Sequence, residues 1–293
     1  MGETLQSNQG LMKAKKIIKE FGPDVAVGVG GYASAPTLKK ASSLGVPSLL
    51  QEQNSYPGVT NKMLSKKVQK ICVAYDGLDQ FFPAEKIVKT GNPVREQVIQ
   101  IDGKKKDACT HFGLDPNKKT ILVIGGSLGA LTLNDSIQNG YKELAKDDVQ
   151  VLWQCGKYYA ERLTVFAKEN PNKNIVLSPF IDRMDFAYAV ADVVISRAGA
   201  LSVSELCLVG KPSILVPSPN VSEDHQTKNA MALVKNDAAV LVKDIEARET
   251  LVSKALELLK NENELKSLST AILGMAEQNS ASRIVDELLK IKC

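Results

Sequence analysis

The segment from Val193 to Pro217, VVISRAGALSVSELCLVGKPSILVP, constrains the fold more than any other part of the sequence. Its β-branched run at 193–196 predicts a buried strand, and the small residues that follow predict a turn into a helix beginning near Ser202. Gly210 is typical of a helix end, and a second strand follows it. This order predicts a parallel α/β sheet, in which ligands bind at the carboxyl ends of strands and helix N–H groups suit an anion.

Glu205, in the helix of this segment, has two interpretations. Ser202 and Glu205 fit the S-x-x-E capping box, in which the carboxylate only bonds back to the helix backbone. The carboxylate could instead contact a ligand at the sheet edge. The spacing alone favours the capping box, because that motif is common.

Composition limits the class of protein. The chain has 293 residues, of which 44% are hydrophobic and 24% charged, which suits two globular domains. We expect no membrane span and no secretory signal, because no apolar run is long enough. The five cysteines are scattered without C-x-x-C spacing, which indicates a reducing cytoplasm. With only His111 and His225 present, a histidine-rich metal site is excluded, and we expect no metal and no cofactor.

Charge is distributed unevenly along the chain. Residues 1–95 carry a net charge of +6 and residues 96–293 a net charge of −2, which favours an anionic partner for the first part or a solvated basic face. Leu11 to Phe21 predicts an amphipathic helix, which either packs on a sheet or binds anionic lipid through Leu11, Ile17, Ile18 and Phe21 with neighbouring lysines. We expect no nucleic-acid partner.

The first part of the chain predicts four strands. An apolar run from Asp24 enters a glycine turn and then a helix from about Ser34, and further strands are predicted at 48–50, 71–74 and 87–90. The strand at 48–50 leads into Gln51-Glu-Gln-Asn54. This sequence is unusually polar for the end of a buried strand, which favours either a ligand contact or a turn stabilised by Asn54.

The second part of the chain predicts six strands, at about 120–124, 149–153, 175–177, 193–196, 213–216 and 238–242, with helices between them. This alternation predicts a parallel sheet with right-handed crossovers. The first strand leads into Gly125-Gly-Ser-Leu-Gly-Ala130, whose glycines let backbone N–H groups approach a phosphate. The spacing is neither G-x-G-x-x-G nor G-x-x-x-x-G-K-[ST], which weakens the dinucleotide and P-loop interpretations.

Five motifs in this order closely resemble those of the MurG family of glycosyltransferases. They are Gly28-Val-Gly-Gly-Tyr, Gln51-Glu-Gln-Asn54, Gly91-Asn-Pro-Val-Arg95, Gly125-Gly-Ser-Leu-Gly-Ala130 and Ala200-Leu-Ser-Val-Ser-Glu205. The resemblance implies an α/β fold of GT-B type, with two Rossmann-like, doubly wound parallel-sheet domains. We expect an acceptor-side and membrane-side domain at 1–95, a donor-binding domain at 96–278, and a helix at 279–293 that returns to the first domain.

The resemblance also implies an activity: inverting transfer of GlcNAc from UDP-GlcNAc to undecaprenyl-diphospho-muramoyl-pentapeptide in peptidoglycan synthesis. The enzyme would act peripherally, at the anionic cytoplasmic face of the bacterial inner membrane. In the family a histidine on an amino-terminal glycine loop is the leading candidate for the general base. No such loop is found in this sequence, so we expect an incomplete first domain and assign no catalytic residue. Gln51 stands where many relatives have histidine.

Carried over by position, the donor contacts are Asn54, Arg95, Ser127, Ile181, Ala200, Leu201, Ser202, Val203, Ser204, Glu205 and Gln226. The resemblance implies that Arg95 and Ser127 bind the diphosphate and that the Ile181 backbone recognises uracil. It places Glu205 on the ribose hydroxyls, in favour of ligand binding over capping, and Asn54 near the sugar. The remaining residues form the loop beneath the nucleotide and a polar contact to the donor.

Two alternatives to the transferase stay open. A catalytically inactive fragment would bind UDP-GlcNAc without transferring the sugar. A UDP-GlcNAc epimerase or an NAD-dependent enzyme on a similar scaffold is the other, although an NAD site would suit G-x-G-x-x-G better than the loop found here.

Overall fold

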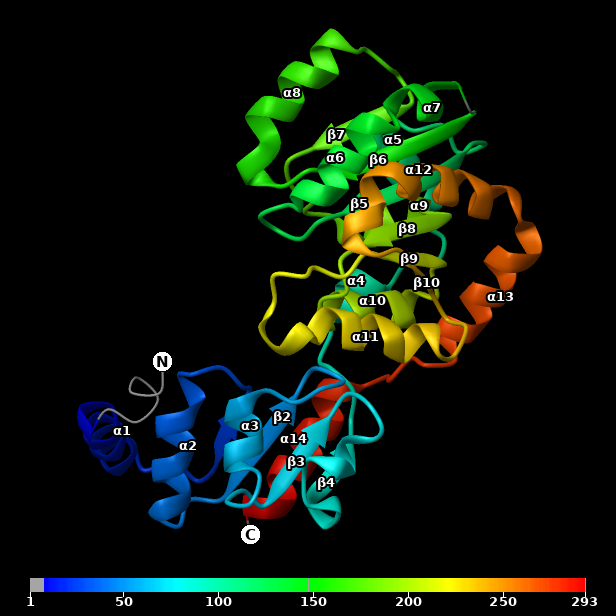
Figure 1. The fold of residues 1–293 in the computed structure, drawn as a ribbon. Helices are drawn as coiled ribbons and strands as arrows, with labels where there is room; N and C mark the ends of the chain where they lie inside the picture. The colour runs from blue at the N-terminus through cyan, green and yellow to red at the C-terminus, as the bar shows by residue number, and fades with distance from the viewer. Residues whose placement is uncertain (1–7, 147, 293) are drawn as a thin grey trace. The chain divides into compact units, whose positions relative to one another are not determined.

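The chain forms two compact α/β units in the computed structural model, which describes residues 8–146 and 148–292 (Figure 1). The first unit consists of the described residues up to Pro93 together with those from Glu277 onwards, and the second is Val94–Ala276. Each unit contains one sheet, and every pair of neighbouring strands in both sheets is parallel. The predicted fold class is therefore confirmed.

The first unit has a four-stranded sheet in the order β1-β2-β3-β4. Its elements are α1 (Asn8–Phe21), β1 (Ala26–Gly28), α2 (Ser34–Ser43), β2 (Ser48–Glu52), α3 (Val59–Leu64), β3 (Lys70–Val73), the 3₁₀ turns η2 (Leu78–Gln80) and η3 (Ala84–Lys86), β4 (Ile87–Lys89) and α14 (Ser280–Lys292). Leu38, Leu50 and Ile71 form the centre of its core. Each is an apolar residue on the face that its strand or helix turns inward.

The helix α14 comes from the end of the chain but lies beside β3 of the first unit (Figure 1). Arg283 of α14 donates one hydrogen bond to the Glu277 carboxylate, at 2.7 Å, and another to the carbonyl of Lys89 on β4. The Lys89 ammonium pairs with Glu277 at 3.1 Å. These contacts fasten the start of α14 to the last strand of the first sheet.

The second unit has a six-stranded sheet in the order β10-β9-β8-β5-β6-β7. Its strands are β5 (Lys119–Ile124), β6 (Val149–Gln154), β7 (Ile175–Ser178), β8 (Val193–Ser196), β9 (Ser213–Leu215) and β10 (Val240–Leu241). Its helices are α4 (Glu96–Ile99), α5 (Lys105–Phe112), α6 (Leu131–Asn139), α7 (Tyr141–Lys146), α8 (Ala160–Glu169), α9 (Met184–Val190), α10 (Ala200–Val209), α11 (His225–Val234), α12 (Asp244–Lys260) and α13 (Glu262–Leu273), with 3₁₀ turns η4 (Lys157–Tyr159) and η5 (Ser222–Asp224).

The strand order of this sheet reverses between β5 and β8. The chain builds β5, β6 and β7 toward one edge and then returns to place β8 on the other side of β5. Crossovers on the two sides of such a reversal leave a crevice at the carboxyl ends of the two strands, where α/β proteins bind ligands. The residues that follow Ile124 and Ser196 therefore lie at this crevice.

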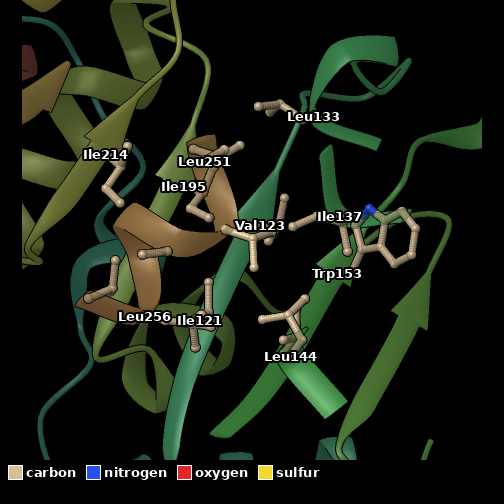
Figure 2. Packing of buried hydrophobic residues seen from close by; sticks show 14 of the residues in the cluster. Ile121, Val123, Leu133, Ile137, Leu144, Trp153, Ile195, Ile214, Leu251 and Leu256 are labelled. Carbon is tan, nitrogen blue, oxygen red and sulfur yellow. The ribbon is translucent and has the colours of Figure 1, made fainter. Parts of the chain in front are cut away.

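The core of the second unit packs α12 against the central strands. Figure 2 shows Ile121 and Val123 of β5 and Ile195 of β8 beside Leu251 and Leu256 of α12. All of these side chains are buried, and burying such a side chain contributes about 1.5–3 kcal/mol. This packing covers β5 and β8, the two strands on either side of the reversal, with one helix.

Every strand predicted from the sequence is present, and most strand ends differ by one or two residues. The predicted helix at Leu11–Phe21 is also present as α1, but its apolar side chains are not all available to a membrane. Ile18 is buried, whereas Ile17 is 53% and Phe21 79% exposed. The prediction that Ile18 contributes to a lipid-binding face is therefore wrong, because α1 uses this residue to pack on its own unit.

Candidate functional site

A cavity of about 920 Å³ lies in the second unit at the carboxyl ends of β5 and β8. The glycine loop after β5, Arg197 after β8, the first two turns of α10 and the loop after β7 all line it. Its position matches the strand reversal, which is where the topology alone places a ligand site.

The glycine loop is held in one conformation by close backbone contacts. Gly126 and Gly129 have φ angles of 82° and 83°, which L side chains rarely adopt. A Cβ atom on Gly129 would lie 2.1 Å from the carbonyl oxygen of Cys155, so only glycine fits. The N–H of Gly125 donates to Oε1 of Gln154 at 3.1 Å. The backbone path of the loop is therefore set by its own contacts with the end of β6.

The helix α6 begins directly after this loop and has no side-chain cap at its N-cap residue, Ala130. The first internal bond of the helix runs from the N–H of Asn134 to the carbonyl of Ala130, at 3.0 Å. The N–H groups of the preceding turn lie at the positive end of the helix dipole and suit an anion. Ser127 is exposed in the loop and lines the same cavity.

The structure rejects the capping-box interpretation of Glu205. The helix α10 begins at Ala200, with Gly199 as its N-cap, so Ser202 lies inside the first turn instead of capping it. The Glu205 carboxylate accepts a hydrogen bond from the hydroxyl of Tyr188, at 2.8 Å. Glu205 therefore faces the cavity from the second turn of α10.

Burial governs the acidity of this pair. Burial raises the pKa of Glu205, while the hydrogen bond from Tyr188 and the positive charge of Arg95 act in the opposite direction without reversing the shift. Burial also raises the pKa of Tyr188 well above its usual range, and the adjacent carboxylate adds to this effect. The phenol therefore keeps its proton and remains a donor at any ordinary pH.

Several of the predicted contact residues line this one cavity. They are Arg95, Ser127, Ile181, Ser202, Glu205 and Gln226. Ile181 is buried, and Oε1 of Gln226 accepts a hydrogen bond from the Ser218 N–H at 2.9 Å.

The remaining predicted contact residues are the neighbours of Ser202 and Glu205 on α10, and Asn54. Ala200, Leu201, Val203 and Ser204 belong to α10 but are not among the residues that line the cavity. Val203 is buried in the core and Leu201 is 51% exposed, because the helical period turns only some positions of a continuous segment toward the crevice. Asn54 belongs to the first unit, where its backbone N–H and its side-chain amide both donate to the Glu52 carboxylate.

The polar tip Gln51–Asn54 forms a network inside the first unit. The Glu52 carboxylate, which is buried, also accepts from the Gly58 N–H at 3.1 Å and from Nδ2 of Asn61 at 2.8 Å. Nε2 of Gln51 donates to Oδ1 of Asn92 at 2.9 Å. These bonds fix the loop that follows β2 and determine the direction in which Asn54 points.

Sequence reasoning missed several cavity-lining residues, among them Tyr188, Arg197 and Asp244. The Arg197 guanidinium donates to the carbonyls of Val216, at 2.9 Å, and Pro217, at 3.2 Å, and to the Asp244 carboxylate. Arg197 could have been predicted from the sequence, because it is a charged residue directly after the buried strand 193–196. The other two are brought in by tertiary packing alone.

Two absences concern the described residues, 8–146 and 148–292. None of these residues forms a group of three or more His, Cys, Asp or Glu side chains that could hold a metal ion. Within the same ranges, no helix has the length and apolar character that crossing a membrane requires.

Comparisons with known proteins agree with this architecture. Residues 120–288 match the glycosyltransferase family 28 C-terminal domain, and residues 1–73 match the N-terminal domain of the same family. The UDP-N-acetylglucosamine--N-acetylmuramyl-(pentapeptide) pyrophosphoryl-undecaprenol N-acetylglucosamine transferase of Parabacteroides distasonis is 57% identical over 283 residues, covering 97% of this chain and 77% of the relative.

Solved structures give a consistent result. The crystal structure of Acinetobacter baumannii MurG has a TM-score of 0.78 and 30% identity, over 96% of this chain and 77% of that one. A putative UDP-N-acetylglucosamine 2-epimerase from Listeria monocytogenes has a TM-score of 0.70 over 99% of this chain and 81% of that one, but its 14% identity shows a shared fold alone.

Two α/β units with parallel sheets, with a glycine loop and a carboxylate at the strand reversal of the second, form the GT-B architecture, and the family models that match the chain place it among the glycosyltransferases. Within that class the chain belongs to glycosyltransferase family 28 and, by its 57% identity to the Parabacteroides distasonis transferase, to the MurG family.

Proposed function

We propose that this chain transfers N-acetylglucosamine from UDP-N-acetylglucosamine to undecaprenyl-diphospho-muramoyl-pentapeptide, a step of peptidoglycan synthesis. The observation that carries the proposal is the grouping of Glu205, Arg95 and the glycine loop around one cavity at the strand reversal. A volume of about 920 Å³ suits a ligand of nucleotide-sugar size. The name of the 57%-identical relative supplies the donor and the acceptor.

In the proposed binding mode the donor spans the cavity. The ribose hydroxyls donate to the Glu205 carboxylate, and the diphosphate lies between the N-terminus of α6, Ser127 and Arg95. The backbone of Ile181 recognises uracil. This arrangement places the negative charge of the nucleotide at the positive end of a helix and beside a guanidinium, where both stabilise it.

The same contacts serve the chemical step. The acceptor hydroxyl attacks the anomeric carbon from the face opposite UDP, a C–O bond forms, and the bond to the diphosphate oxygen breaks with inversion. Negative charge develops on the departing diphosphate, where the α6 N–H groups and Arg95 stabilise it. The acceptor proton passes to a general base. Gln51 cannot fill this role, because an amide does not accept a proton near neutral pH.

Calorimetric titration of UDP-GlcNAc and of UDP, combined with a radiolabelled transfer assay on the lipid acceptor, tests the proposal. We expect saturable binding that weakens roughly tenfold or more in Glu205→Ala, the loss of hydrogen bonds to a charged group. Labelled product then identifies a transferase, whereas binding without product identifies an inactive binding module. Absence of saturable binding by a chain that melts cooperatively would contradict the proposal.

The basic helix α1 supports a second part of the proposal, that the enzyme attaches to an anionic membrane surface on the cytoplasmic side. Its four lysines are exposed together with Ile17 and Phe21; these lysines are Lys13, Lys15, Lys16 and Lys19. Apolar side chains among lysines suit the interface of an anionic bilayer.

Liposome cosedimentation tests this attachment. Ile17→Glu should reduce binding to vesicles that contain anionic lipid, while Val165→Glu on α8 should not, although the two residues are equally exposed at 53% and 52%. If both variants bound vesicles equally well, or if binding did not depend on the anionic lipid fraction, α1 would be ruled out as the attachment site.

A further inference from the structure

The hydroxyl of Tyr188, the one polar group of its side chain, bonds to a residue of the candidate site. Tyr188 lies on α9 and is completely buried, so its ring belongs to the core. Tyr188 is among the residues that line the cavity, and its hydroxyl donates to Oε2 of Glu205, at 2.8 Å. The two residues come from different helices, α9 and α10, and meet only through the fold.

We propose that Tyr188 is a positioning residue, which holds the Glu205 carboxylate in the orientation that selects a ribonucleotide. The phenol occupies Oε2 and leaves Oε1 to accept from the ribose hydroxyls. The inference rests on the proposed function, because it takes the ribose as the group that Glu205 binds.

Geometry makes the phenol suited to this role. A glutamate side chain has three rotatable bonds, and a partly buried carboxylate without a donor would rotate toward any available N–H group or water. The Tyr188 ring is fixed by the core on every side, so its hydroxyl holds one carboxylate oxygen at a defined point. A carboxylate that is already oriented loses less conformational entropy when the ribose binds, so the ribose is bound more tightly.

Selectivity for ribose follows from the same arrangement. A nucleotide that lacks the ribose hydroxyls leaves Oε1 desolvated and without a donor, and sites built around such a bond reject the analogue strongly. Without Tyr188 the carboxylate is free to turn toward water and must be ordered again when the ribose binds, so the affinity for UDP falls. The preference for a ribonucleotide, and not affinity in general, is therefore the property that Tyr188 should control.

The experiment measures dissociation constants of UDP and of 2′,3′-dideoxyuridine 5′-diphosphate by calorimetry. We expect wild type to prefer UDP, and Tyr188→Phe to lower this preference roughly fivefold, as the loss of one hydrogen bond predicts. The affinity for the dideoxy nucleotide should not change. In the Glu205→Ala background the same substitution should have no further effect, since the two residues act as one unit.

Tyr141→Phe is the matched control. The Tyr141 hydroxyl is also part of a largely buried side chain and donates to the carbonyl of Asn170 at 2.7 Å, so its removal costs similar stability. This variant should retain the wild-type preference. Steady-state kinetics add a second readout: Tyr188→Phe should raise KM for UDP-GlcNAc and leave kcat nearly unchanged, because the ribose contact persists through the reaction.

The outcomes separate this inference from the proposed function. A wild-type chain that does not bind UDP overturns both. A wild-type chain that prefers UDP, together with a Tyr188→Phe variant that retains the full preference, overturns the positioning role alone. Equal weakening of both nucleotides in Tyr188→Phe also overturns it, since that pattern reports a general loss of structure. Phenylalanine fills the same volume, so a bound dideoxy nucleotide confirms that the cavity is intact.

Discussion

Arg197 and Asp244 form an ion pair that joins the end of β8 to the first residue of α12. Both side chains are less than one-fifth exposed. Oδ2 of Asp244 also accepts from the Thr132 hydroxyl, at 3.0 Å, so that the start of α6 is tied to the same carboxylate. The elements around the cavity are therefore linked by one network of charged groups and not only by the core beneath them.

Removing Arg197 should destabilise the second unit. Arg197→Ala removes the cationic partner of the largely buried Asp244 carboxylate and the donor to two backbone carbonyls, and we expect a loss of about 3 kcal/mol in the free energy of unfolding. Arg162→Ala is the control, because Arg162 is half-exposed, pairs with Asp135 at 3.3 Å and should cost less than about 1 kcal/mol. Urea denaturation measures both. Equal losses in the two variants would mean that the Arg197 network contributes no special stability.

The two positive-φ glycines of the loop after β5 give a matched pair of substitutions. Gly126→Ala adds only backbone strain of about 1–2 kcal/mol, since nothing lies within 4 Å of the new Cβ atom. Gly129→Ala adds the same strain and a collision with the Cys155 carbonyl. We expect Gly129→Ala to have the lower melting temperature and the weaker UDP affinity. If Gly126→Ala had the lower melting temperature and the weaker UDP affinity instead, the loop would have to move away from the Cys155 carbonyl without cost.

The strands were predictable because each is a short apolar run bounded by glycine, proline or polar residues, a local signal that the structure retains. The helix start at Ala200 was not, because Gly199 acts as the N-cap through its extended backbone, with φ −65° and ψ 148°, and not through a side chain. The S-x-x-E spacing therefore predicted the wrong partner for Glu205. Its actual partner, Tyr188, is 17 residues away in sequence and is brought close only by the packing of α9.

Glu277 should stabilise the first unit in a pH-dependent way. Burial acts to raise the pKa of Glu277, but hydrogen bonds from Arg283 and Lys89 outweigh it and the pKa is lowered. A carboxyl group with a lowered pKa in the folded state contributes stability above its unfolded pKa, and this contribution is lost as the pH falls through the folded value. Glu277→Gln should therefore lower stability by about 1 kcal/mol at pH 7 and by little at pH 3. Urea denaturation at the two pH values measures this. The same loss at both pH values would exclude an ionic contribution.

The raised pKa of Glu205 predicts the pH dependence of nucleotide binding. The groups that act on it are Tyr188 on α9, which stays protonated, and the guanidinium of Arg95, so we expect Glu205 itself to titrate. Ribose hydroxyls donate to the carboxylate form, so UDP affinity should fall as the pH is lowered, beginning above the ordinary glutamate value of about 4.3. Below the pKa of Glu205 the dissociation constant should rise by up to tenfold for each pH unit, as one proton competes with the ligand. Calorimetric titrations at successively lower pH, starting from pH 7.5, measure this slope, and Glu205→Gln should remove it. A slope that persists in Glu205→Gln would assign the titration to another group, such as the nucleotide phosphate, and would contradict the predicted role of the carboxylate.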